Sequence, residues 1–325
     1  MPSGVLVFGE AAEDGSLAPV TGELLGAAKS LGGPVVCALL GAGVEGLAKE
    51  CGALGADKVI VVDDDVLKEY QGDAYVPIGE RICKEADPSV VLFGQTILGR
   101  DMSPRLAVRL GTAVVMDCVE LSLDGEKLQA SRPCYGGSAR ARYTFNGTPQ
   151  IATLRAKVYD PPERDDSRQA EVVRQPADVS AEAIRTRIVS RRKEEVEGVR
   201  LEDAPAVVSG GRGLGGPEGF QPLEELAEVL GGAVGATRAV CDMGWYPVAA
   251  QVGLTGKVVT PDLYIAVGIS GASQHMAGIS QVKNIVAINK DPEANIFQAA
   301  RFGVVGDWKE VLPAFTEKVR ELKAG

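Results

Sequence analysis

The chain has 325 residues, a length that favours two domains over one. Its formal net charge of −10 argues against a general nucleic-acid binder, which is typically basic. No apolar run approaches the roughly 20 residues of a membrane span, and the N-terminus lacks the features of a signal peptide. We therefore expect a cytoplasmic protein of bacterial or archaeal type that is not embedded in a membrane, with a mature organellar protein as the alternative.

Glycine is plentiful, at 40 residues, whereas aromatic residues make up only 5% of the chain. Aliphatic strands joined by glycine-containing turns are typical of α/β architecture. The six cysteines form no C-x-x-C pair and His275 is the single histidine, so no zinc or iron–sulfur site is expected. The cysteines are interpreted as reduced thiols of an intracellular protein.

Strand and helix signals alternate over the first 110 residues, which predicts a parallel sheet with right-handed crossovers. The expected strands cover residues 4–8, 34–40, 58–62 and 89–94. The expected helices cover residues 21–31, 45–51, 76–86 and 101–110.

Strand-like segments without intervening helices follow, at residues 118–123, 128–132, 139–145 and 150–154. Asn146-Gly147 is a hairpin signal between the last two, and we expect this meander to complete the first sheet. Residues 157–180 are polar, and an extended surface segment is predicted there. The charged run at 183–200 indicates a domain boundary, which gives domains of residues 1–193 and 194–325.

The second domain begins with a strand at 205–209 that leads into a glycine-rich loop. Residues 211–216 match G-x-G-x-x-G, a weak signal on its own. A proline and a glycine interrupt the approach to the next helix, at 223–230, and no acidic residue ends a second strand about 20 residues later. The loop is therefore not interpreted as a nicotinamide-dinucleotide site, although Arg212 within it suggests a charged ligand group nearby.

Polar side chains recur at the ends of the strands in this second half. Further strands are expected at residues 233–242, 263–269, 284–289 and 303–307, with an amphipathic helix at 312–322. The polar residues at the strand ends are Arg212, Arg238, Ser270, Asn289 and Asp307. Ligands of an open parallel sheet bind in the crevice at the carboxyl ends of its strands, so these residues predict a binding site.

The stretch 263–278 is the best candidate for the core of that site. A buried strand leads into a loop of small and polar residues, 270–275, and a helix is expected from Met276 onward. Backbone N–H groups in such a loop point together and bind phosphate or another anion. The stretch also contains His275, so a nucleotide-cofactor site is predicted.

Several long motifs occur together in one order along the chain. They are GQTILGRDMSPR (94–105), SGGRGLG (209–215), GATRAVCD (235–242), QVGLTGK (251–257), PDLYIAVGISGASQHMAG (261–278) and NIVAINKDPEANIFQAARFGVVGD (284–307). With these motifs the chain closely resembles the α subunit of electron-transfer flavoproteins over essentially its whole length.

The resemblance implies an α/β fold of two domains, each a mostly parallel sheet flanked by helices. The N-terminal domain is expected to have a nucleotide-hydrolase-like fold without bound nucleotide, and the C-terminal one a doubly wound FAD-binding fold. A β subunit would pack over the FAD and carry AMP or a second FAD of its own. The heterodimer would be an electron carrier, not an enzyme. It would take electrons from flavin dehydrogenases, such as the acyl-CoA dehydrogenases of fatty acid β-oxidation, and deliver them to a membrane quinone oxidoreductase.

Three other functions stay open at this point. Within the family, an electron-bifurcating or nitrogen-fixation-linked variant would use NADH and reduce ferredoxin. Outside it, a nicotinamide- or CoA-dependent α/β enzyme is disfavoured, because the ribose-binding carboxylate, a second histidine and a nucleophile–base pair are all missing. A purely structural partner of the β subunit would not retain FAD.

The resemblance also implies roles for residues at the flavin ring. His275 is expected at the pyrimidine edge, where a donor stabilises negative charge on the reduced ring. Arg238 is expected beside the ring, where a guanidinium favours the electron-rich form and raises the potential. Thr255 is expected to hydrogen-bond near N5. A loop histidine, a surface ion pair and a turn threonine are the structural alternatives.

The remaining expected residues would hold the rest of the dinucleotide. Arg212 would neutralise the pyrophosphate, while Asn289 and Asp307 would face the adenosine; for Asp307 a helix cap is the alternative. The full set of expected FAD-binding residues is Arg212, Thr237, Arg238, Gln251, Val252, Gly253, Thr255, Ser270, Gly271, Ala272, Ser273, Gln274, His275, Asn289 and Asp307. No catalytic residue and no metal ligand is expected.

Overall fold

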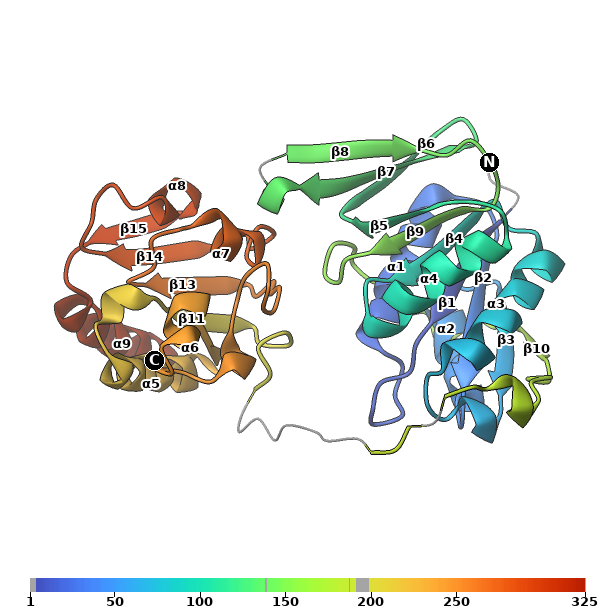
Figure 1. The fold of residues 1–325 in the computed structure, drawn as a ribbon, viewed down its shortest axis with the longest axis horizontal. Helices are drawn as coiled ribbons and strands as arrows, with labels where there is room; N and C mark the ends of the chain where they lie inside the picture. Colours follow the sequence, from blue (N-terminus) through green and yellow to red (C-terminus); the bar gives the residue numbers. More distant parts are fainter. Residues whose placement is uncertain (1–3, 138, 187, 191–198, 325) are drawn as a thin grey trace. The chain divides into compact units, whose positions relative to one another are not determined.

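The computed structural model of the chain describes residues 4–137, 139–186, 188–190 and 199–324. The chain divides into two units, Met1–Cys134 with Arg140–Arg191 and Tyr135–Ala139 with Arg192–Gly325 (Figure 1). The boundary predicted at 193/194 lies outside the described residues. Each unit has its own hydrophobic core, as expected for a chain of this length.

The first unit is built on a parallel sheet that, in the described ranges, has seven strands in the order β10-β3-β2-β1-β4-β9-β5. The strands are β1 (Val5–Gly9), β2 (Val35–Gly41), β3 (Lys58–Asp63), β4 (Val90–Gly94), β5 (Val114–Cys118), β9 (Gln150–Leu154) and β10 (Glu171–Arg174). Their central members are apolar along their whole length because both faces are covered.

Helices cover both faces of this sheet. They are α1 (Pro19–Leu31), α2 (Ala48–Ala53), α3 (Gly72–Ala86) and α4 (Ile97–Arg109). Alternate residues of β1 point to opposite faces: Val7 packs with Leu24 of α1, whereas Phe8 packs with Ile78 of α3. The alternation of strands and helices over the first 110 residues therefore predicted this layered arrangement.

The meander after residue 113 is the main departure from expectation in the first unit. Only β5 and β9 join the parallel sheet. The segments β6 (Glu120–Asp124), β7 (Lys127–Cys134) and β8 (Ala139–Thr144) form a separate three-stranded sheet, green in Figure 1. The predicted Asn146-Gly147 hairpin is wrong, because β8 and β9 lie in different sheets. The turn between β6 and β7 is formed instead by Gly125-Glu126, where Gly125 has φ +61°.

A second correction concerns the polar segment 157–180, expected to be extended surface chain. Its residues Glu171–Arg174 form β10, which pairs in parallel with β3 at the sheet edge. The strand is short and mostly exposed, so hydrophobic patterning gives no signal for it.

The second unit contains a parallel sheet of five strands among the described residues, in the order β12-β11-β13-β14-β15. The strands are β11 (Ala206–Gly210), β12 (Ala233–Ala236), β13 (Leu263–Val267), β14 (Ile285–Asn289) and β15 (Phe302–Val305). The helices are α5 (Gln221–Leu230), α6 (Arg238–Asp242), α7 (Ser273–Ala277), α8 (Ile296–Ala299) and α9 (Trp308–Ala324). The fold class is therefore as predicted.

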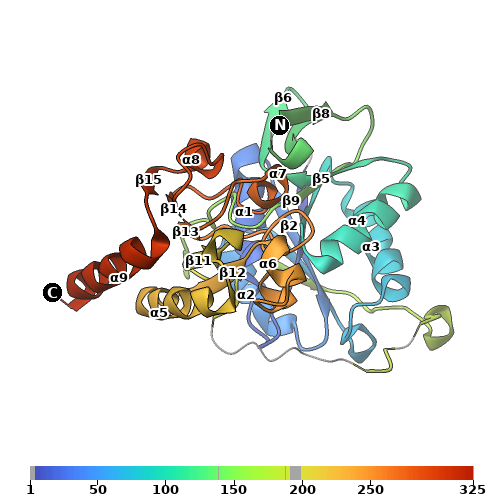
Figure 2. The same ribbon diagram turned by 60° about the vertical axis from the view of Figure 1, so that its left-hand side comes forward.

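The two faces of the second sheet are covered differently. The long helices α5 and α9 lie side by side on one face (Figure 2), where Leu226 and Leu312 pack with Ile265 of β13. Short helices and loops cover the other face, where Val252 and Ile296 pack with Tyr264. Several element boundaries were predicted wrongly, among them the start of α9, which lies at Trp308 instead of residue 312. The strand expected at 233–242 ends at Ala236 and continues as α6, and α7 begins at Ser273 instead of Met276.

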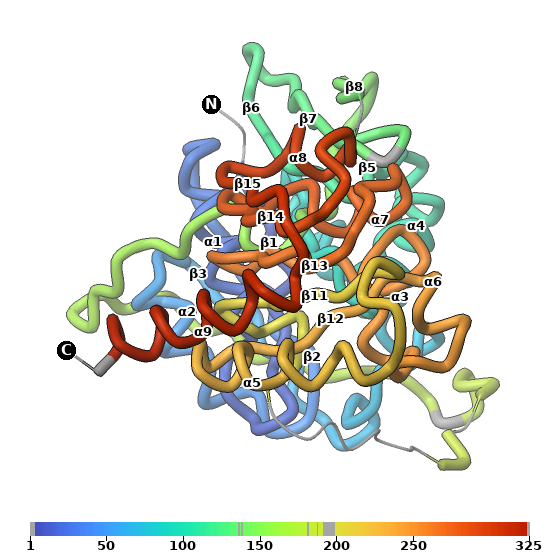
Figure 3. Tube along the Cα trace, turned by 90° about the vertical axis from the view of Figure 1, so that its left-hand side faces the viewer, coloured from blue at the N-terminus to red at the C-terminus, as the bar shows by residue number. Residues whose placement is uncertain are grey.

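The strand order places a crevice at a defined point of the second sheet. The chain runs from β11 outward to β12 and then returns to the other side of β11 to form β13 (Figure 3). Consecutive crossovers therefore leave the carboxyl ends of β11 and β13 in opposite directions. In doubly wound sheets this switch point is where ligands bind.

None of the helices in the described ranges is both long and apolar enough to cross a lipid bilayer.

Candidate functional site

A cavity of about 780 Å³ opens at the carboxyl ends of β11, β13 and β14, at the switch point of the second sheet. Its volume is within the usual range for small-molecule and cofactor sites. The lining residues are Gly211, Arg212, Gly213, Thr237, Arg238, Ala239, Asp242, Gln251, Val252, Gly253, Leu254, Thr255, Gly268, Ile269, Ser270, Ala272, Gln274, His275, Asn289, Lys290, Asp291 and Ala294.

The loops after β11 and β13 are held together along the cavity floor by their backbones. The Gly211 N–H donates to the Val267 carbonyl at 2.9 Å, and the Gly213 N–H donates to the Gly268 carbonyl at 3.0 Å. A Cβ at Gly211 would collide with the Gly268 carbonyl oxygen. The glycines of the G-x-G-x-x-G match thus allow two strand-end loops to approach each other, which explains the match without a nicotinamide site.

The loop beyond β13, which carries the lining residues Ser270 and Ala272, has backbone donors without a partner in the described part of the chain. Within the described ranges, the N–H groups of Ser270, Gly271 and Ala272 donate to no protein acceptor. The loop is fixed by its carbonyl, since Ser270 O accepts from Ile296 N at 3.1 Å. Gly271 has φ +82° and a Cβ there would collide with the Ile296 backbone, so only glycine fits. Free N–H groups on a fixed loop suit an anionic ligand group.

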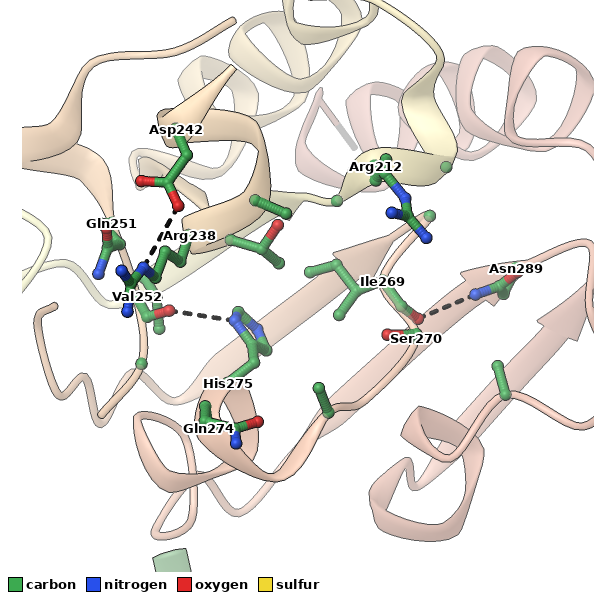
Figure 4. A pocket seen from close by; sticks show the side chains of 18 of the residues that line it. Arg212, Arg238, Asp242, Gln251, Val252, Ile269, Ser270, Gln274, His275 and Asn289 are labelled. Carbon is green, nitrogen blue, oxygen red and sulfur yellow. Dashed lines mark hydrogen bonds and ion pairs between the residues drawn. The ribbon is translucent and has the colours of Figure 1, made fainter. Parts of the chain in front are cut away.

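The two sides of the cavity carry different side chains (Figure 4). On one side lie Arg238, Gln251 and His275; on the other lie Arg212 and Asn289. The cavity therefore has a cationic group on each side, and an elongated anionic ligand would contact both Arg238 and Arg212.

Gln251 and Asn289 both use their side-chain amides within the protein. Gln251 Nε2 donates to Thr255 Oγ1 at 3.1 Å. Asn289 Nδ2 donates to the Ile269 carbonyl at 2.9 Å, and its Oδ1 accepts from the Asp291 N–H at 3.0 Å. Asn289 thus ties the end of β14 to the loop after β13, and little of its amide remains for a ligand.

His275 is buried, and both of its ring nitrogens have protein partners. Nδ1 lies 3.1 Å from the Val252 carbonyl oxygen and Nε2 lies 2.9 Å from the Tyr264 hydroxyl. Burial lowers the pKa of His275 to about 4, so the ring is neutral at physiological pH. Because a carbonyl can only accept, the ring's one N–H points at Val252. The donor expected at the flavin is therefore used inside the protein.

Charged side chains of both signs line the cavity. Arg238, at the start of α6, pairs with Asp242 one turn later, with Nε 3.3 Å from the carboxylate oxygen. Arg212 and Lys290 have no carboxylate partner among the described residues. The excess of positive charge fits an anionic ligand.

Most of the residues expected from the sequence line the cavity, and three do not. The exceptions are Gly271, Ser273 and Asp307. Asp307 accepts from the Lys309 N–H at 3.0 Å and so caps α9, which is the alternative that the sequence left open. Ser273 is exposed at the start of α7. Gly271 shapes the loop through its backbone.

Sequence reasoning missed several lining residues. They are Gly211, Gly213, Ala239, Asp242, Leu254, Gly268, Ile269, Lys290, Asp291 and Ala294. Two of them had a signal that could have been used. Asp242 stands four residues after Arg238, the spacing of a helical ion pair, and Lys290 directly follows a polar strand end. The others, apart from Asp291, are small or apolar residues whose position depends on the folded loops.

Two family models match the chain in succession. The electron transfer flavoprotein domain matches residues 5–180, and the electron transfer flavoprotein FAD-binding domain matches residues 200–280. The second match contains β11 to α7 and thus most of the cavity.

Curated relatives match over nearly the whole chain. The electron transfer flavoprotein subunit alpha of Bacillus subtilis is 45% identical over 320 residues, 98% of each chain. That of Thermoanaerobacterium thermosaccharolyticum is 45% identical over 326 residues, again 98% of each. Protein FixB of Clostridium saccharobutylicum is 40% identical over 326 residues, 98% of this chain and 97% of that one. The chain therefore belongs to the electron transfer flavoprotein α-subunit family.

Proposed function

We propose that this chain is the α subunit of a heterodimeric electron transfer flavoprotein and that it holds FAD in the cavity of its second unit. The observation that carries the proposal is the combination, at the β11–β13 switch point, of free backbone donors with unpaired cations in a cavity of cofactor size. Bound FAD would supply the redox chemistry, and the protein residues would bind it, orient it and adjust its potential.

The side with Arg212 suits the pyrophosphate. Its guanidinium would neutralise the phosphates, and the backbone donors of 270–272 would bind their oxygens. Lys290 lines the same cavity and adds a second positive charge. This division leaves the opposite side for the flavin ring.

The side with Arg238 suits the ring. A positive charge there stabilises the extra negative charge of the reduced form, and Asp242 offsets part of this effect. Thr255 Oγ1 accepts from Gln251, so the hydrogen of the Thr255 hydroxyl remains available for an acceptor on the ligand. The expected contact of Thr255 near N5 is consistent with this polarity.

The proposed partner is an electron transfer flavoprotein β subunit that carries AMP or a second FAD. The relatives named as α subunits support the heterodimer. We propose that the complex acts in the cytoplasm, accepting electrons from flavin dehydrogenases such as acyl-CoA dehydrogenases and passing them to a membrane quinone oxidoreductase.

The relatives named FixB favour a second candidate, a nitrogen-fixation-linked or electron-bifurcating variant. The two candidates differ in measurable ways. A bifurcating heterodimer would contain two FAD and would reduce ferredoxin with NADH, whereas an ordinary carrier would contain one FAD and one AMP.

Co-expression with a β subunit tests the proposal. The purified heterodimer is expected to be yellow and to release FAD on denaturation. Counting FAD and AMP per heterodimer separates the two candidates. A correctly folded heterodimer that stays colourless after incubation with FAD would refute the proposal.

A further inference from the structure

A buried tyrosine lies behind the cavity wall and contacts its only histidine. Tyr264 is on β13 and is fully buried, and His275 is on α7. The Tyr264 hydroxyl lies 2.9 Å from His275 Nε2, and neither residue is charged at neutral pH, because burial raises the pKa of the phenol and lowers that of the imidazole. Tyr264 is absent from the cavity lining, so it can act on a ligand only through another residue.

Which of Tyr264 and His275 donates the hydrogen bond follows from the other partner of the ring, the Val252 carbonyl. The Val252 carbonyl, 3.1 Å from Nδ1, can only accept, which places the ring proton on Nδ1. In a neutral ring Nε2 is then a lone-pair acceptor. The Tyr264 hydroxyl must therefore be the donor, and the chain of bonds runs from Tyr264 through His275 to Val252.

Val252 belongs to the loop 251–257, which lines one side of the cavity. The same loop is tied to α7 by the Leu254 N–H, which donates to the Gln274 carbonyl at 2.8 Å. His275 thus adds a side-chain link between α7 and the loop that carries Gln251 and Thr255. Without a donor at Nε2, the bond to Val252 would be the ring's only hydrogen bond, and the ring would lose the second contact that fixes its orientation.

We propose that Tyr264 is a positioning residue for the cavity: its hydroxyl holds the His275 ring in the one orientation that fixes the loop 251–257 against α7. The effect on FAD affinity rests on the proposed function, whereas the state of the ring does not. His275 then acts as a link within the cavity wall.

The charged groups around His275 do not compete with this arrangement. Tyr264 faces it from β13, and Lys257 of the loop is paired with Glu202 at 3.0 Å. Arg238 and Asp242 of α6 lie on the same side of the cavity as His275 and pair with each other (Figure 4). None of these groups donates to or accepts from the ring except Tyr264.

The single histidine makes the inference directly measurable. The full chain labelled with ¹⁵N-histidine has one imidazole, so its nitrogen resonances report His275 alone. The wild type is expected to show a protonated Nδ1 and a bare Nε2 that do not titrate between about pH 5.5 and 8. A ring protonated on Nε2, or one that titrates in this interval, would overturn the proposal without any variant.

Tyr264→Phe removes only the hydroxyl. The Nε2 resonance is expected to shift because this nitrogen loses its hydrogen-bond donor, and FAD is expected to bind about fivefold more weakly, the size of one lost hydrogen bond. The matched control is Tyr246→Phe, which removes a hydroxyl bonded to Glu224 at 3.1 Å in the same unit and should leave the resonances and the affinity unchanged.

Two results with Tyr264→Phe contradict the proposal. One is a wild-type imidazole spectrum, which would mean that Tyr264 does not set the ring. The other is an altered spectrum with wild-type FAD affinity, which would mean that the ring does not position the cavity. If neither the wild type nor the variant bound FAD, the proposed function would fail, and the resonances would still decide whether Tyr264 holds His275.

Discussion

Gln251 donates a hydrogen bond from its side-chain amide to the hydroxyl oxygen of Thr255, across 3.1 Å. The bond lies within one loop of the cavity wall, and Gln251 is the more buried of the two residues. The sequence assigned both residues to the cofactor as separate contacts. In the structure Gln251 instead supports Thr255. The Thr255 hydroxyl oxygen already accepts from the Gln251 amide, so its hydrogen is free to be donated to another acceptor.

Gln251→Leu should therefore weaken FAD binding although Thr255 is retained. Loss of the supporting bond leaves the Thr255 hydroxyl free to rotate, so affinity is expected to fall about three- to tenfold in a fluorescence titration. Gln298→Leu, an exposed glutamine on α8, is the control and should bind FAD normally. Wild-type affinity in Gln251→Leu would show that Thr255 needs no support.

Arg238 and Asp242 should shift the flavin potential in opposite directions. Arg238→Ala removes a positive charge from the ring side and should lower the potential, whereas Asp242→Asn removes a negative one and should raise it. Both side chains are largely exposed, so each shift is expected to be modest, about 40 mV, which corresponds to about 1 kcal/mol for one electron.

Potentiometric titration of the FAD-loaded heterodimer measures both shifts. The control is Arg320→Ala, which breaks another exposed ion pair of the second unit, to Glu225 on α5, outside the cavity. Shifts of the same sign in Arg238→Ala and Asp242→Asn would contradict the proposal that this ion pair lies beside the flavin ring.

Gly211→Ala should disturb the cavity floor. Its Cβ would collide with the Gly268 carbonyl oxygen and push apart the loops after β11 and β13. Such overpacking typically costs about 1–3 kcal/mol of stability. Gly232→Ala is matched to it, since its Cβ would collide equally closely with the Ala206 carbonyl oxygen, away from the cavity.

Both variants should unfold at lower denaturant concentration, and only Gly211→Ala should also lose FAD affinity. Denaturant unfolding and FAD titration on the same preparations separate the two effects. Equal affinity losses in both variants would mean that general destabilisation, and not the floor geometry, controls binding.

The sequence predicted the sheets better than the details around them. Buried parallel strands such as β13 are continuous apolar runs, and their loops begin with glycine, so their existence and order along the chain were readable. The boundary between β12 and α6 was not readable, because its one start signal, the N-cap Thr237, is followed by a helix of little more than one turn. The sheet that a strand joins is a tertiary property, which is why β6, β7 and β8 were misassigned.

In the candidate site, too, the features that depend on tertiary structure could not be predicted from the sequence. Residue types and strand ends indicated which loops form the cavity, since polar side chains at carboxyl ends of parallel strands meet at one edge. Whether a polar side chain faces the ligand or another residue depends on its neighbours in space. His275 and Asn289 both use their polar atoms within the protein, with partners up to 23 residues away in the sequence. No spacing rule identifies such partners.

Glu10 should make the stability of the first unit depend on pH. It follows β1, is partly buried and accepts from the Thr96 hydroxyl at 2.7 Å. Burial raises its pKa from the usual 4.5 to about 7. The native state therefore binds the proton more tightly than the unfolded chain, so this group's stabilising effect is full below about pH 4.5 and is lost as the pH rises to about 7.

Glu10→Gln keeps the shape and the Thr96 bond but cannot ionise. The decrease in unfolding free energy between pH 5 and pH 8 should be smaller in this variant than in the wild type, by up to about 3 kcal/mol. Thermal unfolding across this interval tests it, with the exposed Glu120→Gln as control. An identical pH profile for Glu10→Gln and wild type would show that Glu10 titrates normally.

Asp307 has two alternative roles that experiment can distinguish: capping α9 and contacting the cofactor. Its carboxylate accepts from the Lys309 N–H at 3.0 Å at the first turn of α9, and its backbone carbonyl accepts from the Glu310 N–H at 3.1 Å. Asp307→Ala should therefore lower stability by about 1 kcal/mol, as cap removal usually does, and leave FAD affinity unchanged. Asp307→Asn retains a capping oxygen and should restore most of the stability. The family resemblance instead places Asp307 at the adenosine, which requires weaker FAD binding in Asp307→Ala at undiminished stability, so urea unfolding and FAD titration of the two variants decide between the roles.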